Sequence, residues 1–246
     1  MLPFYDSMKY HQNLLLYGVL AGLVACTALL SGCGLTSAAK DESLSLSAVF
    51  KLRSLAKVEH VALSSQAAAQ SLQYATLKAE LDVGEVRALL VLAKNAASGQ
   101  QWVGADGSGF TTWQGRITRY YTPALDLSRI EISPLYPQYG FAAAFQYGRI
   151  SAPFELDNDT EQRFQVLGKA TLYYDGKQPR MYWGKPTEML QFSERIEVPS
   201  TGFTHVNYYW LDPQTFFVWE SQQKWWPQMP LISIQVLKPW EAVRYP

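Results

Sequence analysis

The feature that most constrains the fold is an alternation of apolar and polar residues that recurs between residues 74 and 238. Successive side chains of a β-strand point to opposite faces, so this period of two is typical of strands with one buried face. It is clear in 74–81, 164–174, 203–211 and 232–237. Aromatic residues, which suit a pleated, half-buried surface, make up 14% of the chain. The pattern predicts an all-β domain whose strands are mostly antiparallel.

Residues that favour tight turns divide this region into hairpins. The strongest example is Asp212–Thr215, because an Asp-Pro pair suits the first two positions of a type I turn. Turns are expected at 82–85, 106–109, 175–177 and 212–215. Strands are expected at 74–81, 86–93, 101–104, 111–113, 116–121, 164–174, 189–198, 203–211, 216–223 and 232–237.

The middle of the chain and its N-terminal part differ from this pattern. The segment 122–160 contains prolines that each remove a backbone donor and fix φ, namely Pro123, Pro134, Pro137 and Pro153. Loops and short strands are therefore expected there. Short helices are expected before the sheet, over Val49–Val58 and Ala62–Gln70.

The N-terminal segment predicts export. An apolar run, Leu14–Leu30, ends in Leu30-Ser31-Gly32-Cys33, and a basic start, an apolar middle and a small-residue end are typical of a secretory signal. The sequence Leu-Ser-Gly-Cys resembles a bacterial lipobox, which implies that the Cys33 thiol is acylated and that the chain is cut between Gly32 and Cys33. Residues 1–32 are then a lipoprotein signal peptide, 33–48 a lipidated tether and 49–246 a β-rich domain.

Other readings of this segment stay open. An uncleaved membrane helix would need about 20 apolar residues, and the run is slightly shorter. Processing at Cys26 would leave apolar residues at the start of the mature chain. The acidic Asp6 precedes the only basic residue of the signal, so Met8 is an alternative to Met1 as the true start.

Cysteine content and charge limit the kind of protein that results. Processing leaves 214 of the 246 residues, which is enough for one domain with its own core. Cys26 leaves with the signal and Cys33 is acylated, so no disulfide and no thiolate zinc site is expected. The formal net charge is zero, so the chain has no general attraction for nucleic acid. No nucleic-acid partner is expected.

The sequence predicts no catalytic residues, no metal site and no cofactor. The histidines of the mature chain, His60 and His205, lie in no recognisable motif, and His205 is expected on the outward face of its strand. The acidic segment 157–161 is expected to be a solvated loop, because Gln162 and Gly168 stand where a calcium loop has its Gly and Glu. Carboxylates on or near strands leave a glycoside hydrolase reading open, namely Glu194, Glu197, Asp212 and Glu220.

One aromatic pair is a candidate contact site. Trp225 and Trp226 follow a strand, where adjacent side chains point to opposite faces, so at least one of them is expected to be exposed. Tryptophan is enriched where proteins bind partners, and its broad ring also suits sugars. Trp225 and Trp226 are therefore predicted to contact a glycan or a protein partner.

Several pieces of the chain, in their order, resemble the YjbF/GfcB family of lipoproteins linked to group 4 capsule and exopolysaccharide production. Besides the lipobox at Cys33, the matching pieces are Leu72–Thr76, Ala88–Ala93, Trp102–Gly107, Thr112–Ile117, Tyr209–Pro213, Ser221–Gln223 and Ile232–Pro239. The chain departs from the family at Tyr120–Pro123, where a Gly-Leu pair is common. The resemblance implies an antiparallel sheet that is open or half-barrel-like, and it carries over no catalytic residues.

The resemblance also implies a location and a set of partners. Gly34 follows the acylated cysteine where an Asp would favour retention in the inner membrane, so the outer membrane, facing the periplasm, is the expected site. The expected role is that of a non-enzymatic accessory factor in capsule or exopolysaccharide assembly or export, with protein partners in the secretion apparatus and polysaccharide as a candidate ligand. The alternatives are a lipid or lipoprotein carrier with a curved β-sheet cavity, and a periplasmic enzyme that modifies polysaccharide.

Overall fold

The computed structural model describes residues 66–82 and 87–240. This part of the chain contains two α-helices, α4 (Gln66–Ser71) and α5 (Phe141–Tyr147), and one short 3-10 helix, η2 (Pro199–Thr201). The strands are β1 (Thr76–Leu81), β2 (Arg87–Ala96), β3 (Gly99–Val103), β4 (Gly109–Trp113), β5 (Arg116–Tyr121), β6 (Asp126–Ile132), β7 (Arg149–Asn158), β8 (Arg163–Tyr182), β9 (Lys185–Val198), β10 (Phe203–Leu211), β11 (Val218–Gln223) and β12 (Ile232–Lys238). No helix among these residues has the length and apolar character needed to cross a membrane.

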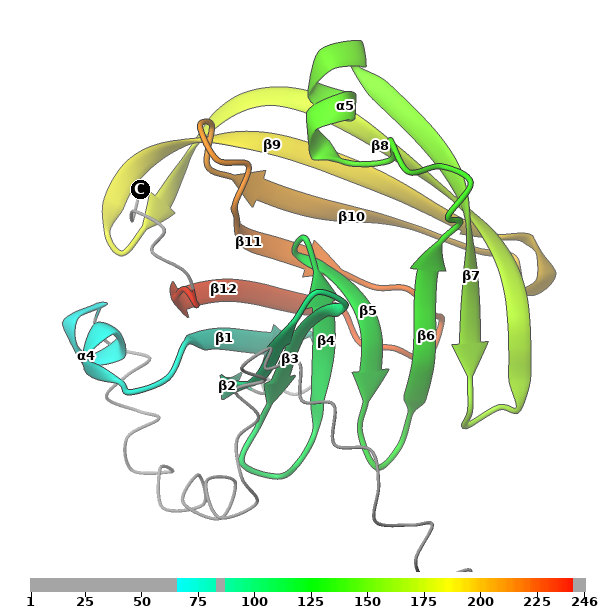
Figure 1. Ribbon diagram of the computed structural model, residues 1–246, viewed down its shortest axis with the longest axis horizontal. Helices are drawn as coiled ribbons and strands as arrows, with labels where there is room; N and C mark the ends of the chain where they lie inside the picture. The colour runs from blue at the N-terminus through cyan, green and yellow to red at the C-terminus, as the bar shows by residue number, and fades with distance from the viewer. Residues whose placement is uncertain (1–65, 83–86, 241–246) are drawn as a thin grey trace, which may run out of the picture. The chain divides into compact units, whose positions relative to one another are not determined.

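The all-β prediction is confirmed, but the expectation of an open or half-barrel-like sheet is wrong. Every strand pairs antiparallel with its neighbours in the chain, and β1 also pairs with β12, from Thr76–Lys238 to Leu81–Ile232 (Figure 1). This last ladder closes the sheet into a twelve-stranded barrel. Closure is favoured because it leaves neither end strand with a row of unpaired backbone groups.

Side chains fill the interior of the barrel. The alternation of each strand turns one set of residues inward, as with Leu77 and Ala79 of β1 and Ile232 and Ile234 of β12. The largest buried members of this core are Trp102, Phe154, Phe192, Tyr209, Trp225 and Trp226. The aromatic residues that suggested a β domain therefore mostly build its core.

The proline-rich middle of the chain is more regular than expected. It contains β6, α5 and the ten-residue strand β7, which includes Pro153. The carbonyl of Pro153 accepts a hydrogen bond from the Ser133 N–H, just beyond Ile132, the last residue of β6. The missing N–H of Pro153 points to the same side, where β6 has already ended. Proline is tolerated here because no ladder bond needs its N–H.

The turn expected at 175–177 is wrong, because β8 and β9 continue past it. Asp175 is an extra residue in the ladder between them, and Gly176 has a φ of 104°. An Asp-Gly pair with positive φ serves a β-bulge as well as a turn. Beyond this bulge, β8 and β9 form a curved two-stranded ribbon that ends at Trp183–Gly184 (Figure 1).

The ribbon packs against β10, β11 and β12. Its Tyr182 and Met189 form a second buried cluster with Trp210, Trp219 and Val236. Trp210 points to the opposite face of its strand from the inward-facing Tyr209, so the ribbon covers the outside of the barrel there. Arg180 of the ribbon lies 4.1 Å above the Trp210 ring and pairs with Glu220 of β11 at 2.8 Å.

The barrel wall is weakest between β5 and β6. Their ladder has two pairs, Tyr120–Leu127 and Tyr121–Asp126, and they separate beyond it (Figure 1). A register shift between β4 and β5, where Thr118 is the extra residue, bends β5 at this point. We call the separated parts, residues 116–119 of β5 and 128–132 of β6, the seam.

The hairpin tip between β4 and β5 reaches across to β11. Gly115 has a φ of 77°, and a Cβ at this position would lie 2.4 Å from Cγ2 of Val218. Only glycine permits both the backbone angle and the close approach. The tip therefore leaves β6 and brings the start of β5 into the interior.

Candidate functional site

A crevice opens at the seam. It has a volume of about 540 Å³ and lies between β5 and β6, with Trp225 among the residues that line it. Three arginines and one glutamate contribute to its lining, namely Arg116, Arg119, Arg129 and Glu131. Hydroxyl groups of Thr111, Thr118 and Ser128 also belong to lining residues. Most of the exposed surface of the crevice is apolar. Among its charged groups, Arg129 is held by Glu131, Glu155 and Asp157.

A second cavity, which we call the mouth pocket, adjoins the crevice at Trp113. It has a volume of about 520 Å³ and lies between the β4–β5 tip, the segment 137–143 and the start of β11. Aromatic rings dominate its lining, with the amide side chains of Gln114 and Gln138 beside them. Trp113 lines both cavities and is 41% exposed. The two cavities thus meet at an exposed tryptophan ring.

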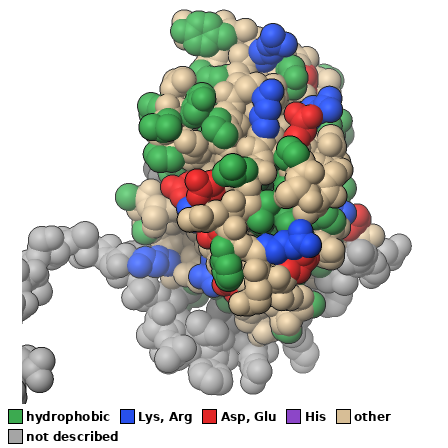
Figure 2. All heavy atoms as spheres, turned by 90° about the vertical axis from the view of Figure 1, so that its right-hand side faces the viewer, with side chains coloured by type: hydrophobic (Ala, Val, Ile, Leu, Met, Phe, Trp, Pro, Cys, Tyr) green, Lys and Arg blue, Asp and Glu red, His purple; other side chains and the backbone are tan. Residues whose placement is uncertain are grey.

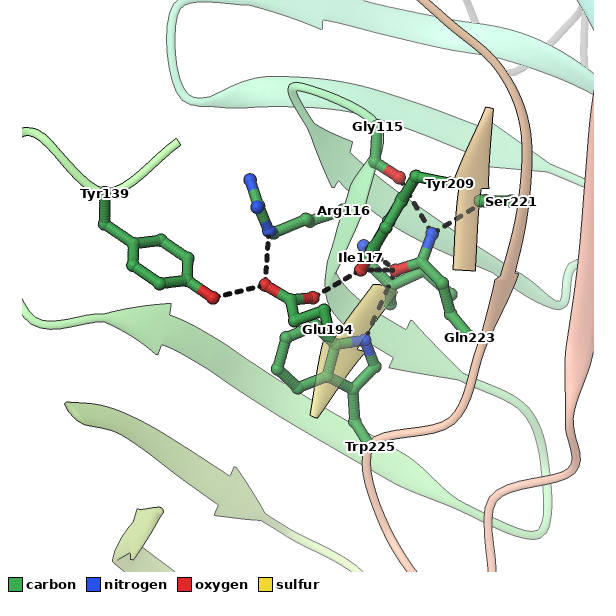
Figure 3. A network of polar contacts seen from close by, with 9 residues as sticks. All are labelled: Gly115, Arg116, Ile117, Tyr139, Glu194, Tyr209, Ser221, Gln223 and Trp225. Atoms are coloured by element: carbon green, nitrogen blue, oxygen red, sulfur yellow. Dashed lines mark hydrogen bonds and ion pairs between the residues drawn. The ribbon is translucent and has the colours of Figure 1, made fainter. Parts of the chain in front are cut away.

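Beneath these cavities lies a buried ion pair, shown in Figure 3. Arg116 Nε donates to Glu194 Oε1 at 2.8 Å, and neither side chain is more than 3% exposed. Tyr139 donates its hydroxyl hydrogen to the same oxygen at 2.7 Å, and Tyr209 donates to Glu194 Oε2 at 2.6 Å. Both oxygens of the Glu194 carboxylate are therefore held by neighbouring donors.

The Arg116 guanidinium is only partly satisfied. Its Nη1 and Nη2 atoms are buried and have no hydrogen-bond partner among the described residues. In Figure 3 they point away from Glu194 and Gln223. The guanidinium carbon lies 4.3 Å from the centre of the Phe141 ring, and the rings of Tyr139 and Tyr209 are also near it. These rings stabilise the charge through cation–π contacts.

The surroundings fix the protonation of this group of residues. Burial alone would lower the pKa of Arg116, but the charge of Glu194 holds that pKa above its usual value. Burial raises the pKa of Tyr139 and of Tyr209, and the negative charge of Glu194 raises both further. Both phenols therefore remain protonated and serve as donors to Glu194.

Gln223 connects the bent start of β5 to this network. Its Nε2 donates to Gly115 O at 2.8 Å, and its Oε1 accepts from Ile117 N at 2.9 Å. The side-chain amide thus takes the place of a neighbouring strand at these two backbone groups. Trp225 Nε1 also donates to Gln223 Oε1, at 3.3 Å, so the same amide holds the ring that lines the crevice.

The geometry favours binding over acid–base chemistry. Glu194 has both oxygens occupied, and Glu131, the one carboxylate among the lining residues of the crevice, lies 3.5 Å from Arg129. General acid–base hydrolysis of a glycosidic bond needs two carboxyl groups that face one substrate. Within residues 66–82 and 87–240, no group of three or more His, Cys, Asp or Glu side chains is placed to hold a metal ion.

The residues predicted from sequence are scattered. Gly32, Cys33, His60 and the tether lie outside the described residues. Trp225 and Trp226 are each 1% exposed, so the expectation that one of them is exposed is wrong. They belong to the loop between β11 and β12, which folds into the core, and Trp226 Nε1 donates to Glu161 Oε1 at 2.8 Å. Their contact with a glycan or partner remains a prediction, now without the exposure on which it depended.

His205 is also placed differently from the expectation. It pairs with the buried Ile196 and so belongs to the inward face of β10, where the sequence placed it outward. Its Nε2 is buried and finds no partner in the part of the chain that the structure describes. Burial, together with the charge of Lys224, lowers the pKa of His205.

The carboxylates considered for catalysis do not converge. Glu220 pairs with Arg180 on the outer face, Glu197 pairs with Arg195, and Asp212 accepts bonds within its own turn. In the acidic segment 157–161, Asp157 pairs with Arg129, Asp159 accepts from Ser128 and Glu161 binds Trp226. Each of these carboxylates is thus held by a different neighbour.

Arg116, Tyr139 and Trp113 were not identified from the sequence as site residues. One signal was available for Glu194, which lies between Phe192 and Ile196 on the inward face of an alternating strand. A charge at an inward position requires a buried partner. Nothing in the pattern shows which residue that partner is, because Arg116 lies 78 positions away in the chain.

The chain is similar in fold to a protein of solved structure. That structure is the crystal structure of the hypothetical lipoprotein YmcC from Escherichia coli (K12), with a TM-score of 0.62 and 18% sequence identity. The match covers 80% of this chain and 97% of that one. At this identity the likeness shows the fold alone. No curated protein matches the chain by sequence.

Comparison with family models gives a match over residues 46–237, to the family described as group 4 capsule polysaccharide lipoprotein gfcB, YjbF. The match includes every strand of the barrel except the last residue of β12, and it confirms the resemblance noted in the sequence. The chain therefore belongs to the YjbF family.

Proposed function

We propose that the protein is a non-enzymatic accessory lipoprotein for the assembly or export of capsule or exopolysaccharide. Acyl chains on Cys33 anchor it to the inner leaflet of the outer membrane, and the barrel faces the periplasm. The observation that carries this proposal is the family match, which spans the barrel and names a capsule polysaccharide lipoprotein. Two or more acyl chains give stable attachment, since each buried methylene contributes about 0.8 kcal/mol.

The geometry of the barrel supports a binding role over the alternatives. A carrier of acyl chains needs an unfilled apolar interior, and here large side chains such as Trp102, Phe154 and Phe192 occupy it. A polysaccharide-modifying enzyme needs two carboxylates that face one groove, and the lining of the crevice includes one, Glu131, which is paired with Arg129. The surface seen in Figure 2 has basic and acidic side chains beside one another, without a large field of one sign.

The test is deletion of the gene followed by rescue, with surface polysaccharide as the readout. Deletion is expected to lower the amount of capsule or exopolysaccharide, and the wild-type gene is expected to restore it. Two further variants test the anchor: Cys33→Ala, and a version in which residues 1–33 are replaced by the signal of a soluble periplasmic protein. Both are expected to rescue poorly, because neither carries lipid.

Labelling and fractionation complete this test. Labelled palmitate is expected on the wild-type protein and absent from Cys33→Ala, and the wild-type protein is expected to sediment with the outer membrane. Unchanged polysaccharide after deletion would contradict the accessory role. Full rescue by the unlipidated periplasmic version would contradict the anchoring, and would leave the role in place.

A further inference from the structure

We propose that the groove formed by the crevice and the mouth pocket binds an acidic glycan chain across Trp113. This inference rests on the proposed function, because it names the ligand that such an accessory protein would hold. The two cavities have volumes of about 540 and 520 Å³ and share Trp113 in their linings. Two cavities in series, joined at one exposed ring, fit an extended chain better than a single compact molecule.

The lining chemistry points to a sugar. Trp113 offers a broad ring that is 41% exposed at the junction, and such a ring stacks on the apolar face of a pyranose. Hydroxyl and amide side chains lie on both sides of it, including Thr111 and Thr118 in the crevice and Gln114 and Gln138 in the mouth pocket. These groups donate and accept hydrogen bonds, as the hydroxyls of a sugar require.

The charges point to an acidic sugar. Of the three arginines in the lining of the crevice, Arg129 is already held by Glu131, Glu155 and Asp157, so the attraction for an anion rests on Arg116 and Arg119. Arg119 forms a long pair with Asp126, at 3.4 Å, and lies 5.6 Å from the centre of the Tyr121 ring, and its side chain is 48% exposed. Arg116, at the inner side of the crevice, keeps two buried Nη groups without a partner among the described residues. A guanidinium with free Nη groups matches the geometry of a carboxylate or a phosphate.

The seam explains why the groove lies here. β5 and β6 are joined by only two pairs, so this part of the wall can admit a ligand without breaking an extended ladder. Gln223 already satisfies the Gly115 carbonyl and the Ile117 N–H, the backbone groups that the bend turns away from β6. An extended peptide that added a strand at the start of β5 would find these two backbone groups already hydrogen-bonded. This favours a glycan over an extended peptide as the ligand.

The experiment measures binding by the full mature lipoprotein in detergent micelles. The probes are alginate oligosaccharides, which carry a carboxylate on every sugar, and maltodextrins of the same length, which carry none. Poly-glutamate of matched charge serves as the acidic peptide. Titration calorimetry at low and at high salt gives the affinities. The wild-type protein is expected to bind alginate oligosaccharides more tightly than either of the other probes.

Two variants at exposed positions test the groove with little risk to folding. Trp113→Ala is expected to weaken alginate binding about tenfold, as loss of a stacked ring should. Its control is Phe164→Ala, since Phe164 is 56% exposed and lines neither cavity of the groove. Arg119→Gln is expected to weaken binding about threefold and to reduce its salt dependence. Its control is Arg195→Gln, because Arg195 has a similar exposure of 52% and a similar single pair with Glu197, at 3.2 Å.

A third variant tests the buried guanidinium. Arg116→Lys keeps the positive charge beside Glu194 and removes the planar Nη groups. It is expected to reduce the preference for alginate over maltodextrin, provided that its far-UV circular dichroism matches that of the wild type. If this variant does not fold, Trp113→Ala and Arg119→Gln still decide the question.

Several results would overturn the inference. Failure of the wild-type protein to bind alginate, or equal binding of alginate and maltodextrin, would remove the acidic glycan. Tighter binding of poly-glutamate would assign the groove to an acidic peptide, and equal losses in the control variants would remove the groove as the site. None of these binding results determines whether deletion of the gene lowers surface polysaccharide, so the accessory role is tested separately by the deletion.

Discussion

At the scale of single residues, the ion pair of Arg116 with Glu194 combines strong contacts with a large cost. Taking two charges out of water costs several kcal/mol for each ion, and the pair offsets this only with good geometry and further hydrogen bonds. Tyr139, Tyr209 and the aromatic rings around Arg116 supply those additional contacts. Loss of one charged partner therefore leaves the other buried without compensation.

We expect Glu194→Gln to lower the free energy of unfolding by about 3–5 kcal/mol, because Arg116 would keep its charge without a counter-ion. Urea denaturation followed by circular dichroism measures this change. The control is Glu197→Gln on the same strand, where the pair with Arg195 is partly exposed and the expected loss is at most about 1 kcal/mol. Equal losses in the two variants would show that the buried pair has no special role in stability.

His205 gives a pH dependence whose sign follows from its lowered pKa. The unfolded chain binds a proton near the ordinary histidine pKa of about 6.5, whereas the folded chain binds it only at lower pH. Stability contributed by neutral His205 is therefore complete above about pH 6.5 and is lost as the pH falls toward the folded pKa.

We expect the melting temperature of the wild-type protein to fall between pH 7 and pH 5, and His205→Gln to make this fall smaller. Scanning calorimetry across this range measures the difference. Parallel curves for the two proteins would contradict the assignment. The alternation of residues 203–211 separates the two faces of the strand but does not show which face lies inside, and His205 was expected on the outward one. Only the pairing with Ile196 shows which face is inside.

At the scale of elements, the β4–β5 tip shows how one glycine positions a site. Gly115 permits the close approach to Val218, and this approach brings Arg116 into the interior and opens the seam. We expect Gly115→Ala to lower the free energy of unfolding by about 3 kcal/mol, from backbone strain together with overlap with Val218.

The matched control is Gly107→Ala in the β3–β4 turn. Gly107 has a similar φ of 84°, and a Cβ there would meet nothing within 4 Å. It is expected to lose about 1 kcal/mol from backbone strain alone. Urea denaturation of both variants separates the two contributions. A similar loss in both would mean that the tip adapts to the added methyl group.

The bounds of a strand could be predicted where the alternation of apolar and polar residues and the turn residues beside it lie within one short segment. β5 and β10 begin and end where the alternation placed them, and Asp212 anchors the expected turn by accepting from Gln214 N and Thr215 N. The signals failed where one residue type serves two structures. Gly176 fits a turn and a bulge equally well, and Pro153 is compatible with a strand wherever the neighbouring strand has ended.

At the scale of the whole molecule, closure depends on the ladder between β1 and β12, which are far apart in the sequence. Alternation alone gives the inward face of each strand but does not reveal whether the first and last strands meet. The same limit applies to the candidate site, because Arg116, Tyr139 and Glu194 come from three distant segments.

Closure can be tested by circular permutation. Thr76 and Lys238 are partners in the β1–β12 ladder, so the two ends of the barrel lie side by side. We expect residues 66–240 to fold when a short glycine–serine linker joins Trp240 to Gln66 and new ends are placed in the exposed turn at Asp106–Ser108. The permutant and the unpermuted 66–240 fragment are both expected to unfold in urea in one transition. Failure of the permutant alone would favour a sheet whose ends are apart.

The ribbon of β8 and β9 has a mechanical consequence for the barrel. Around the ring, β11 and β12 lie six strands from β5 and β6, so the ribbon doubles the wall directly across from the seam. The barrel wall is thus two layers thick on one side, whereas on the other side two residue pairs join β5 to β6. We therefore expect thermal unfolding of this barrel to begin with the separation of β5 from β6. The strands beneath the ribbon are expected to stay paired longer, because a second layer packs on them.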